Sequence, residues 1–447
     1  MKQKVEIIAR SVELSTPDSG ELFNTSDRTP ESIEQDMRVL SGRAAGVCYM
    51  QGDYYDDAVH DKDKALKRQN GNAKSGHKSV FEHGHITFKI ETSKMMCMLL
   101  NSINVYTTSE KSARYTKMEP ETEFEANCYE KWTEKFKNII TPLYSSKLTE
   151  KEIEKKAMEN ARYMISVFTP TVIIYTISYG GCYQLIHWLE SLDLELKNRF
   201  NPFTLGGDNT LKVFQDRIVS ETNSLAALLR LSINYTEKSE YEDIIDVKAM
   251  PFRFLDPNLS KETVYNSEVY CINYEASLAC LAQLERHRTI RYSFDPNIYN
   301  KFYVPEIIKN TPLENEWLND MDTLWQQNII PQGTLVSIQE KGLLDDFLLK
   351  CKERLCSRAQ LEIQNNTIDT LNKFKMRYTI DKNNVNLYIK LNRYFTETYN
   401  YRKNDSSSHL YSKVSGELCD VKCRCAISDF ECHEPCKYGR FGLQRTI

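Results

Sequence analysis

A basic triplet at Arg286-His287-Arg288 is the sharpest chemical signal in the sequence, and Gln283 precedes it by about one helical turn. Guanidinium groups form charge-assisted, bidentate hydrogen bonds with phosphate oxygens, and they can lie against an electron-rich ring. An amide such as that of Gln283 can address the carbonyl oxygens and the N–H group of a pyrimidine. The alternative is a solvated basic helix end beside Glu285, so the triplet alone identifies a candidate binding site and no reaction.

The last thirty or so residues carry a second chemical pattern, formed by five cysteines and His433. Thiolates and imidazole together could hold a tetrahedral zinc ion in a reducing compartment, in a structural role. The spacing is not the usual paired C-x-x-C, so an unliganded or redox-active tail remains an equal alternative. The candidate metal ligands are Cys419, Cys423, Cys425, Cys432 and Cys436.

The elements that must position the basic triplet follow from the spacing of apolar residues. Residues 79–90 alternate apolar and polar as a strand does, and residues 92–104 continue with apolar positions at helical spacing. The same unit recurs later, because residues 268–274 alternate like a strand and residues 276–288 follow as a helix. A strand followed by a helix, found twice, predicts an internal duplication.

Each copy continues with a loop rich in Tyr, Pro and Glu and then with helices. The helices are expected at residues 150–168 and 181–196 after the first copy, and at 314–328 and 343–370 after the second. The polar stretch between the copies predicts a domain boundary near residue 246. We therefore expect domains at residues 1–245 and 246–399, and a Ser-rich linker with the Cys-rich tail at 400–447.

The helix that ends in the basic triplet resembles a motif of the flavin-dependent thymidylate synthases. That family has S-x-x-x-x-x-Q-x-x-R-H-R followed by x-x-S-x-N-E-x-S-x-R-Y. Ser277, Gln283 and Arg286-His287-Arg288 fit the first part without a gap, whereas residues 289–296 depart from the second part.

The first copy holds the part that the second copy lacks. Counting from Ser93 by the same spacing places Leu99 where the glutamine belongs and Ser102-Ile103-Asn104 where R-H-R belongs. The count then reaches Ser109-Glu110-Lys111-Ser112-Ala113-Arg114-Tyr115, which resembles the N-E-x-S-x-R-Y of the family with Ser109 in place of Asn.

Two further arginines follow the same reciprocal pattern. Glu159-Asn160-Ala161-Arg162 resembles the A-R segment of the family, in which the arginine binds the nucleotide, while Gln326-Gln327-Asn328 stands there in the second copy. Arg354, shortly before Ala359-Gln360-Leu361-Glu362-Ile363, resembles the arginine that precedes A-Q-x-E-I, while the first copy has Leu189.

In this family the dUMP site is shared between subunits, so the resemblance implies one complete composite site and one inactive site between the two halves. It implies catalytic roles for Arg286 and Glu110. Three arginines and one hydroxyl would hold a nucleotide monophosphate dianion, and Gln283 would address the base. The implied substrate-binding residues are Gln283, Ser112, Arg114, Arg162 and Arg354.

The segment Ser79-Val80-Phe81-Glu82-His83 resembles the S-x-x-E-H of the family, which implies that His83 lies near the flavin and takes part in catalysis. A lone histidine is more often structural than functional, and His77 and His85 lie nearby. The implied cofactor-binding residues are Arg286, His287, Arg288 and His83. The family's Asn-containing flavin segment is poorly matched at residues 178–181 and at 339–344.

The resemblance implies methylation of dUMP to dTMP with FAD, using NADPH and methylenetetrahydrofolate as co-substrates. Most of the chemistry would come from the cofactors, and the protein would position and polarise the base. Two alternatives stay open, namely a related modification of another pyrimidine nucleotide and a noncatalytic nucleotide-binding scaffold. The implied fold is α+β, with two halves of the thymidylate-synthase-complementing type arranged as a pseudo-dimer. Each half would pack helices on a small, mainly antiparallel sheet, and two fused chains would form a homodimer.

Bulk composition limits the partners of this 447-residue chain. The formal net charge is −4 and 27% of the residues are charged, which is typical of an ordinary soluble protein and not of a polybasic nucleic-acid binder. Nucleic acid is therefore an unexpected partner. We expect no membrane association and a cytoplasmic location, because the sequence has no long apolar run and its first residues lack the apolar core of a signal peptide.

Overall fold

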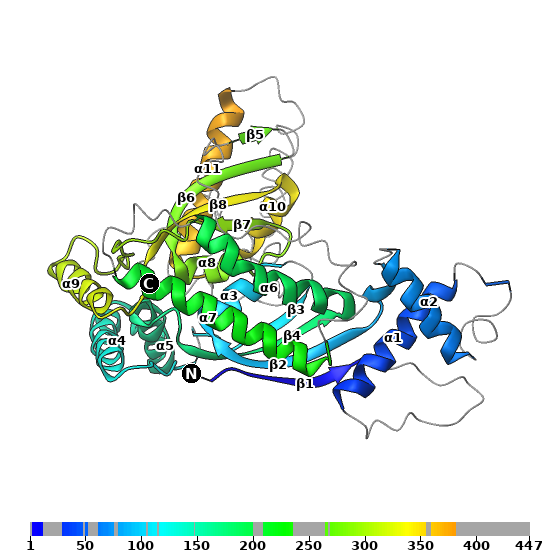
Figure 1. Cartoon of the computed structure of the whole chain (residues 1–447). Helices are drawn as coiled ribbons and strands as arrows, with labels where there is room; N and C mark the ends of the chain where they lie inside the picture. Colours follow the sequence, from blue (N-terminus) through cyan, green and yellow to red (C-terminus); the bar gives the residue numbers. More distant parts are fainter. Residues whose placement is uncertain are drawn as a thin grey trace. The chain divides into compact units, whose positions relative to one another are not determined.

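The computed structural model describes residues 2–11, 29–47, 50–51, 61–75, 79–103, 106–113, 116–146, 148–199, 209–235, 264–266, 269–354 and 359–380 (Figure 1). Arg114 of the predicted site, the predicted boundary near residue 246 and the predicted cysteine ligands lie outside this part of the chain. The predicted boundary and tail therefore stay predictions.

The contacts divide the chain into two units whose segments alternate along the sequence. The first unit comprises Met1–Lys111, Pro170–Phe200 and Lys212–Phe252, and the second comprises Ser112–Thr169, Asn201–Leu211 and Arg253–Ile447. Among the described residues, each unit contains one four-stranded sheet.

The sheet of the first unit is antiparallel with the strand order β1-β2-β4-β3. Its central strands pair Phe88 with Tyr175, and apolar side chains of alternate residues on both strands are buried. The strands are β1 (Lys4–Arg10), β2 (His85–Ser93), β3 (Thr107–Glu110) and β4 (Pro170–Ser178). The helices are α1 (Pro30–Gly46), α2 (Lys62–Lys74), α3 (Lys94–Asn101), α6 (Tyr179–Arg199) and most of α7 (Asn209–Ser232), with the 3-10 helix η3 (Ser79–Glu82).

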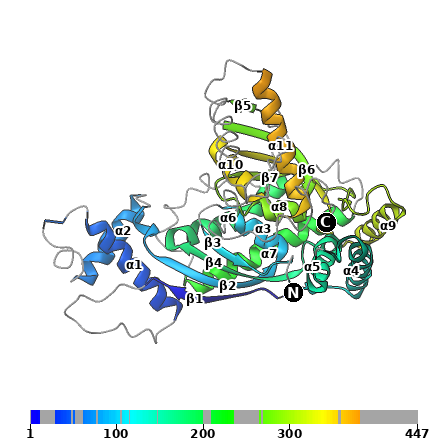
Figure 2. The same ribbon diagram turned by 180° about the vertical axis from the view of Figure 1, so that it is seen from behind.

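The sheet of the second unit has the corresponding order, β5-β6-β8-β7, and is also antiparallel. Ile272 of its central pair lies opposite Glu340. The strands are β5 (Val264–Asn266), β6 (Val269–Ser277), β7 (Arg291–Phe294) and β8 (Leu335–Leu343). Helix α8 (Leu278–Leu284) follows β6, α10 (Leu344–Arg354) follows β8, and α11 (Leu361–Ile380) comes last (Figure 2).

Strands β2 and β6 each lead into a helix through a serine cap. Ser93 accepts a hydrogen bond from the backbone N–H of Met96 at 3.2 Å, and Ser277 accepts one from Cys280 at 3.0 Å. Such a cap satisfies one of the first N–H groups of a helix and fixes where the helix begins. The strand-to-helix turn is therefore built in the same way in both units.

Helices from residues 123–161 pack within the second unit. Helix α4 (Glu123–Tyr144) meets α9 (Pro312–Gln326) through Trp132 and Trp317, whose ring centroids lie 4.8 Å apart in an edge-to-face arrangement. Asp320 also accepts hydrogen bonds from Trp132 Nε1 at 2.7 Å and Lys131 Nζ at 2.6 Å. Helix α5 (Glu150–Ala161) and the 3-10 helix η4 (Arg162–Met164) complete this segment, which therefore belongs with the second sheet.

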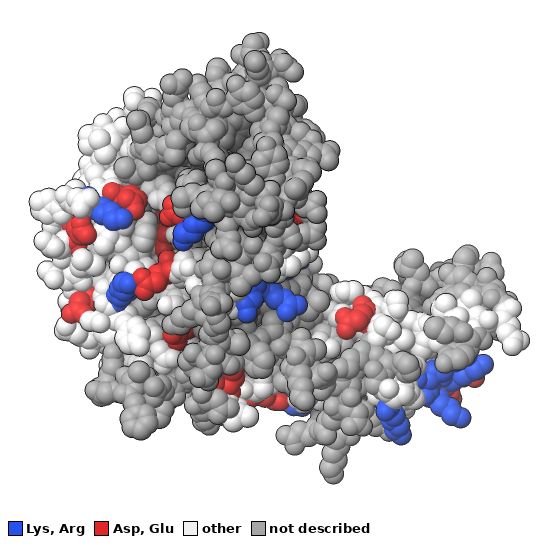
Figure 3. All heavy atoms as spheres, turned by 90° about the horizontal axis from the view of Figure 1, so that it is seen from above, with Lys and Arg blue, Asp and Glu red and all other residues white. Residues whose placement is uncertain are grey.

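On the face drawn in Figure 3, many acidic and basic side chains of the described residues lie next to each other. Ion pairs of the second unit include Lys131 with Glu316 at 2.7 Å and Lys309 with Glu306 at 3.0 Å. Exposed pairs of this kind contribute little to stability because water and salt screen them. They do, however, neutralise much of the local charge.

The α+β class with small antiparallel sheets is confirmed, whereas the pseudo-dimer stays a prediction. The helix expected at residues 276–288 was too long, because α8 ends at Leu284 and the chain turns so that His287 and Ile290 become buried. The helix expected at 343–370 is two helices, α10 and α11. Within the described residues, no helix is both long and apolar enough to cross a membrane.

Candidate functional site

Arg162 is a buried cation in the second unit. It follows α5 directly, its side chain is only 4% exposed, and its Nη2 donates a hydrogen bond to Oε1 of Gln360. Among the described residues, its Nε has no hydrogen-bond partner and no carboxylate forms an ion pair with it. A buried guanidinium is costly without an anion, so Arg162 is well suited to hold an anionic ligand.

The turn after Arg162 is held by a buried carboxylate. Glu125 of α4 accepts hydrogen bonds from the backbone N–H of Ser166 at 2.7 Å and from Thr169 Oγ1 at 3.3 Å. Burial raises the pKa of Glu125, and the hydrogen bond from Ser166 opposes that shift. Helix α4 therefore fixes the turn that follows Arg162.

A chain of hydrogen bonds, which we name the Gln360 network, connects Arg162 to α8. Gln283 Nε2 donates to the same Gln360 oxygen that Arg162 contacts, and Gln360 Nε2 donates to the hydroxyl of Tyr163. Tyr163 donates in turn to Glu362 at 3.0 Å. The network thus comprises Arg162, Tyr163, Gln283, Gln360 and Glu362.

The far end of the Gln360 network is fixed to the beginning of α8. Glu362 accepts hydrogen bonds from the backbone N–H of Ser277 at 2.7 Å and from its hydroxyl at 2.6 Å. Burial raises the pKa of Glu362, and the two bonds from Ser277 act against that shift. Since Ser277 also caps α8, the network and the helix that carries Gln283 form one structure.

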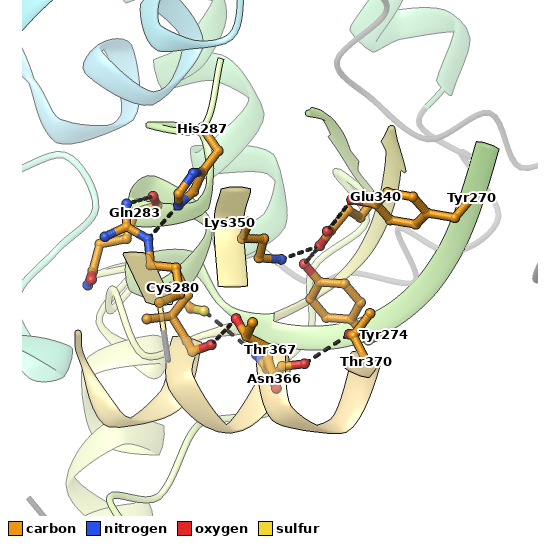
Figure 4. Close-up of polar contacts among 12 residues, drawn as sticks. Tyr270, Tyr274, Cys280, Gln283, His287, Glu340, Lys350, Asn366, Thr367 and Thr370 are labelled. Atoms are coloured by element: carbon orange, nitrogen blue, oxygen red, sulfur yellow. Dashed lines mark hydrogen bonds and ion pairs between the residues drawn. The ribbon is translucent and has the colours of Figure 1, made fainter. Parts of the chain in front are cut away.

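Arg354 lies at the end of α10 and binds two parts of the turn after α8. Its Nε donates to His287 Nε2 at 2.6 Å, and its Nη2 donates to the backbone oxygen of Gln283 at 3.3 Å. Figure 4 shows these contacts beside the labelled His287 and Gln283. The predicted residues Gln283, His287 and Arg354 are therefore in direct contact.

His287 is held neutral by its surroundings. Burial lowers the pKa of His287 from its ordinary value of 6.5 to about 2, and the charges of Arg354 and Lys350 add to this shift. Because Nε2 accepts from Arg354, the ring proton must be on Nδ1. His287 can therefore accept a hydrogen bond at neutral pH but cannot supply a positive charge to a cofactor.

We predict that His287 makes the fold less stable in acid. Below about pH 6.5, His287 binds a proton in the unfolded chain but not in the folded chain. The contribution of neutral His287 to the free energy of unfolding is therefore complete above that pH and decreases as the pH falls. The expected slope is about 1.4 kcal/mol per pH unit at most. The measurement is the free energy of unfolding from about pH 7.5 to 4.5, in the parent and in His287→Gln. Parallel curves would contradict the prediction.

The other predicted residues that the structure describes lie in both units. Arg286 and Arg288 are exposed, and Ser112 is partly buried, all three in the second unit. Glu110 lies in the first unit, where it forms an ion pair with Lys94 and accepts from Asn101 Nδ2 at 3.3 Å. His83 is exposed in the same unit. The structure thus links four predicted residues, Arg162, Gln283, His287 and Arg354, through hydrogen bonds.

Two segments with which the resemblance associates flavin binding meet in the first unit. Ser178 Oγ donates to Glu82, the backbone N–H of Gly181 donates to Ser178 Oγ at 3.0 Å, and Tyr179 N donates to Gly84 O at 2.7 Å. A Cβ atom at Gly180 would lie 2.9 Å from Glu82 Oε1. Glu82 and Phe81 lie so close to Gly180 that a larger residue there would displace them, and their side chains occupy the space beside the turn.

Sequence reasoning missed three members of the Gln360 network, namely Tyr163, Gln360 and Glu362. The signal was present in the A-Q-L-E-I segment, which served only as a landmark for Arg354. Two polar residues in an otherwise apolar helix start are a sign of buried hydrogen bonds. Among the described residues there is no group of three potential metal ligands, and the predicted cysteine ligands lie outside that part of the chain.

The comparison with protein families gives one match, to thymidylate synthase complementing protein, over residues 25–191. A comparison with curated proteins finds no match. Among solved structures, a UMP/dUMP methylase from Streptomyces cacaoi bound with 5-Br dUMP has 13% identity and a TM-score of 0.27, covering 52% of this chain and 97% of that one.

A flavin dependent thymidylate synthase from Helicobacter pylori complexed with FAD and dUMP has 15% identity and a TM-score of 0.28, covering 54% of this chain and 100% of that one. The family match covers the motifs around His83, Glu110 and Arg162. Residues 25–191 thus match the model of the thymidylate synthase complementing proteins, the family of the flavin-dependent thymidylate synthases.

Proposed function

We propose that this protein methylates dUMP to dTMP with FAD, NADPH and methylenetetrahydrofolate, at a composite site formed from its two duplicated halves. One observation carries the proposal. Arg162 belongs to the segment of the first copy that resembles the A-R of the family, and Gln283 belongs to the Q-x-x-R helix of the second copy. Both side chains donate a hydrogen bond to the same oxygen of Gln360. Family motifs that lie far apart in the sequence therefore meet at one acceptor.

The equal topology of the two sheets supports the duplication. Phe88 and Ile272 occupy corresponding places before the capping residues Ser93 and Ser277, and their partners across the central pair are Tyr175 and Glu340. Leu189 and Arg354 also correspond, since each follows the first residue of its helix, Tyr179 and Leu344, by ten positions. This equivalence agrees with the one inferred from the motifs.

The chemistry of the described residues fits a pyrimidine nucleotide. Arg162 would hold a phosphate oxygen, because its buried Nε lacks a partner among the described residues. Gln283 would contact the base, and Arg354 would keep Gln283 and His287 in place through its two hydrogen bonds. Glu110 and Ser112 stay proposed members of the site on the strength of the motif, as does Arg114 outside the described residues.

The side chains proposed to bind FAD are of a suitable chemical type. The exposed Arg286 and Arg288 carry positive charge, and His83 offers an exposed imidazole, which together suit an anionic aromatic cofactor. Bound FAD would supply the redox chemistry, and the protein would bind the nucleotide, orient the base and exclude water. His287 would act as a neutral hydrogen-bonding group in that arrangement.

The experiment is a visible spectrum of the purified full chain with added FAD, followed by reduction with NADPH with and without dUMP. We expect a bound flavin whose rate of reduction changes with dUMP, and chromatography should detect dTMP once methylenetetrahydrofolate is added. A different methylated pyrimidine would instead identify the alternative substrate.

A noncatalytic nucleotide-binding scaffold is the second candidate. The observation in its favour is the turn at Gly180, where Glu82 and Phe81 already fill the space next to the poorly matched flavin segment. Binding of dUMP without any flavin spectrum, under varied salt and FAD concentration, would favour the scaffold over the enzyme.

A further inference from the structure

We propose that Gln360 is a specificity-determining residue that fixes the amide of Gln283 so that it offers an acceptor, and not a donor, to the pyrimidine. The inference rests on the proposed nucleotide site and adds to it a residue with no assigned role. Gln360 is 3% exposed and Arg162 is 4% exposed, so their contact is almost free of competition from water. Only contacts within the second unit are needed for the argument.

The direction of the hydrogen bonds is set by Arg162. A guanidinium has donors and no acceptor, so the Gln360 atom that it contacts must be the amide oxygen. The Gln283 atom that contacts this same oxygen must then be a donor, which is Nε2. A flip of either amide would bring two donors or two acceptors together, so neither amide can reverse at low cost.

The other end of the Gln360 network agrees with this direction. Gln360 Nε2 donates to the Tyr163 hydroxyl, whose own hydrogen is donated to Glu362 at 3.0 Å. Glu362 also accepts from the backbone N–H and the hydroxyl of Ser277. The Gln360 network therefore has a cation that can only donate, Arg162, at one end and a carboxylate acceptor, Glu362, at the other. Only one assignment of donors and acceptors satisfies all of its hydrogen bonds.

The result is a free acceptor on Gln283. Its Oε1 is buried and has no hydrogen-bond partner among the described residues. An unpaired buried carbonyl favours a ligand that donates an N–H group there. If Gln283 Oε1 faces N3 of the base, uracil offers it a hydrogen, whereas N3 of cytosine is an acceptor and would place two lone pairs in opposition.

The specificity experiment compares dissociation constants for dUMP and dCMP, measured by titration calorimetry with the full chain. Both ligands carry the same phosphate, so the ratio of the two constants removes any change in phosphate binding. In the parent we expect dUMP to bind about 10-fold or more tightly than dCMP. In Gln360→Met, Gln283 can rotate and offer either end of its amide, so the ratio should fall to within about 3-fold.

Two further variants test the direction of the bonds and not merely the fold. Gln360→Glu keeps acceptors toward both Arg162 and Gln283, so it should retain the preference of the parent. Thr367→Val removes a buried hydroxyl from the same helix, where Oγ1 donates to Ile363 O at 2.7 Å (Figure 4), and it should leave the ratio unchanged.

The outcomes separate the two proposals. Equal binding of dUMP and dCMP by the parent, or a preference that survives in Gln360→Met, would overturn the role of Gln360 while leaving the nucleotide site intact. Binding of neither nucleotide would overturn the proposed function, and the role of Gln360 with it.

Discussion

Replacement of Arg162 by methionine is expected to weaken dUMP binding by about 100-fold or more, the loss typical when one partner of a buried charged hydrogen bond is removed. The guanidinium is almost fully buried, and its Nε is unpaired among the described residues, so an anion would gain a strong and little-screened interaction. The measurement is the dissociation constant for dUMP, by calorimetry, together with kcat/KM for dTMP formation. Arg162→Lys should fall between the parent and Arg162→Met, because lysine keeps the charge and loses the fork geometry.

Arg230 offers a matched control for this substitution. It is a partly buried arginine that already has an anion, since Nε and Nη2 donate to the two oxygens of Glu190 at 2.7 and 2.9 Å. Arg230→Met should therefore keep dUMP affinity within about 2-fold of the parent, whatever it costs in stability. Similar losses in both variants would mean that arginine removal damages the protein generally and that Arg162 has no special role.

Replacement of Lys350 by methionine should produce the largest loss of stability, about 3–5 kcal/mol in the free energy of unfolding of its unit. Lys350 and Glu340 are 1% and 0% exposed, and Lys350 Nζ lies 2.7 Å from Glu340 Oε2. Glu340 also accepts from Tyr270 at 2.7 Å and from Tyr274 at 2.6 Å, as Figure 4 shows. Without the ammonium group, two neutral donors would have to stabilise a fully buried carboxylate.

The measurement is chemical denaturation followed by tryptophan fluorescence. The double variant Lys350→Met with Glu340→Gln should recover most of the loss, because no unpaired charge would remain in the interior. Lys301→Met is the surface control, since Lys301 and Glu275 are about half exposed and their ion pair should contribute little. A double variant as unstable as Lys350→Met would show that packing, and not charge, explains the effect.

The central strands show why part of the fold escaped prediction. Strand β4, with the sequence PTVIIYTIS, is nearly continuous in apolar residues and lacks the polar alternation that identifies a half-exposed strand. Periodicity cannot distinguish such a run from a buried helix segment. Strands β2 and β6 were recognised because their polar and apolar residues alternate more clearly.

Strand β8 was not predicted from the sequence for a different reason. Its sequence LVSIQEKGL places a charged residue, Glu340, at a buried position, and the lysine that neutralises it comes from the following helix. Only the folded chain reveals that Tyr270 and Tyr274 also point to this carboxylate. A buried ion pair breaks the apolar pattern from which strands are recognised.

The candidate site was predictable where its residues belong to motifs and not where they connect motifs. Arg162, Gln283 and Arg354 were identified from spacing, but spacing does not tell that Arg162 and Gln283 share one acceptor. The sequence also did not predict that His287 is buried between two exposed arginines. The reason is that the triplet lies in a turn after α8 and not in the helix itself. Such facts depend on where the chain bends.

The alternating segments of the two units have a consequence for synthesis of the protein. Lys131 and Trp132 of α4 leave the ribosome long before Asp320, since 189 and 188 residues separate them from their acceptor. Until α9 has been made, Trp132 and Phe136 lack their ring contacts with Trp317. Slow, late completion of such long-range contacts exposes apolar surface to aggregation, so the nascent chain should depend on chaperones that bind α4.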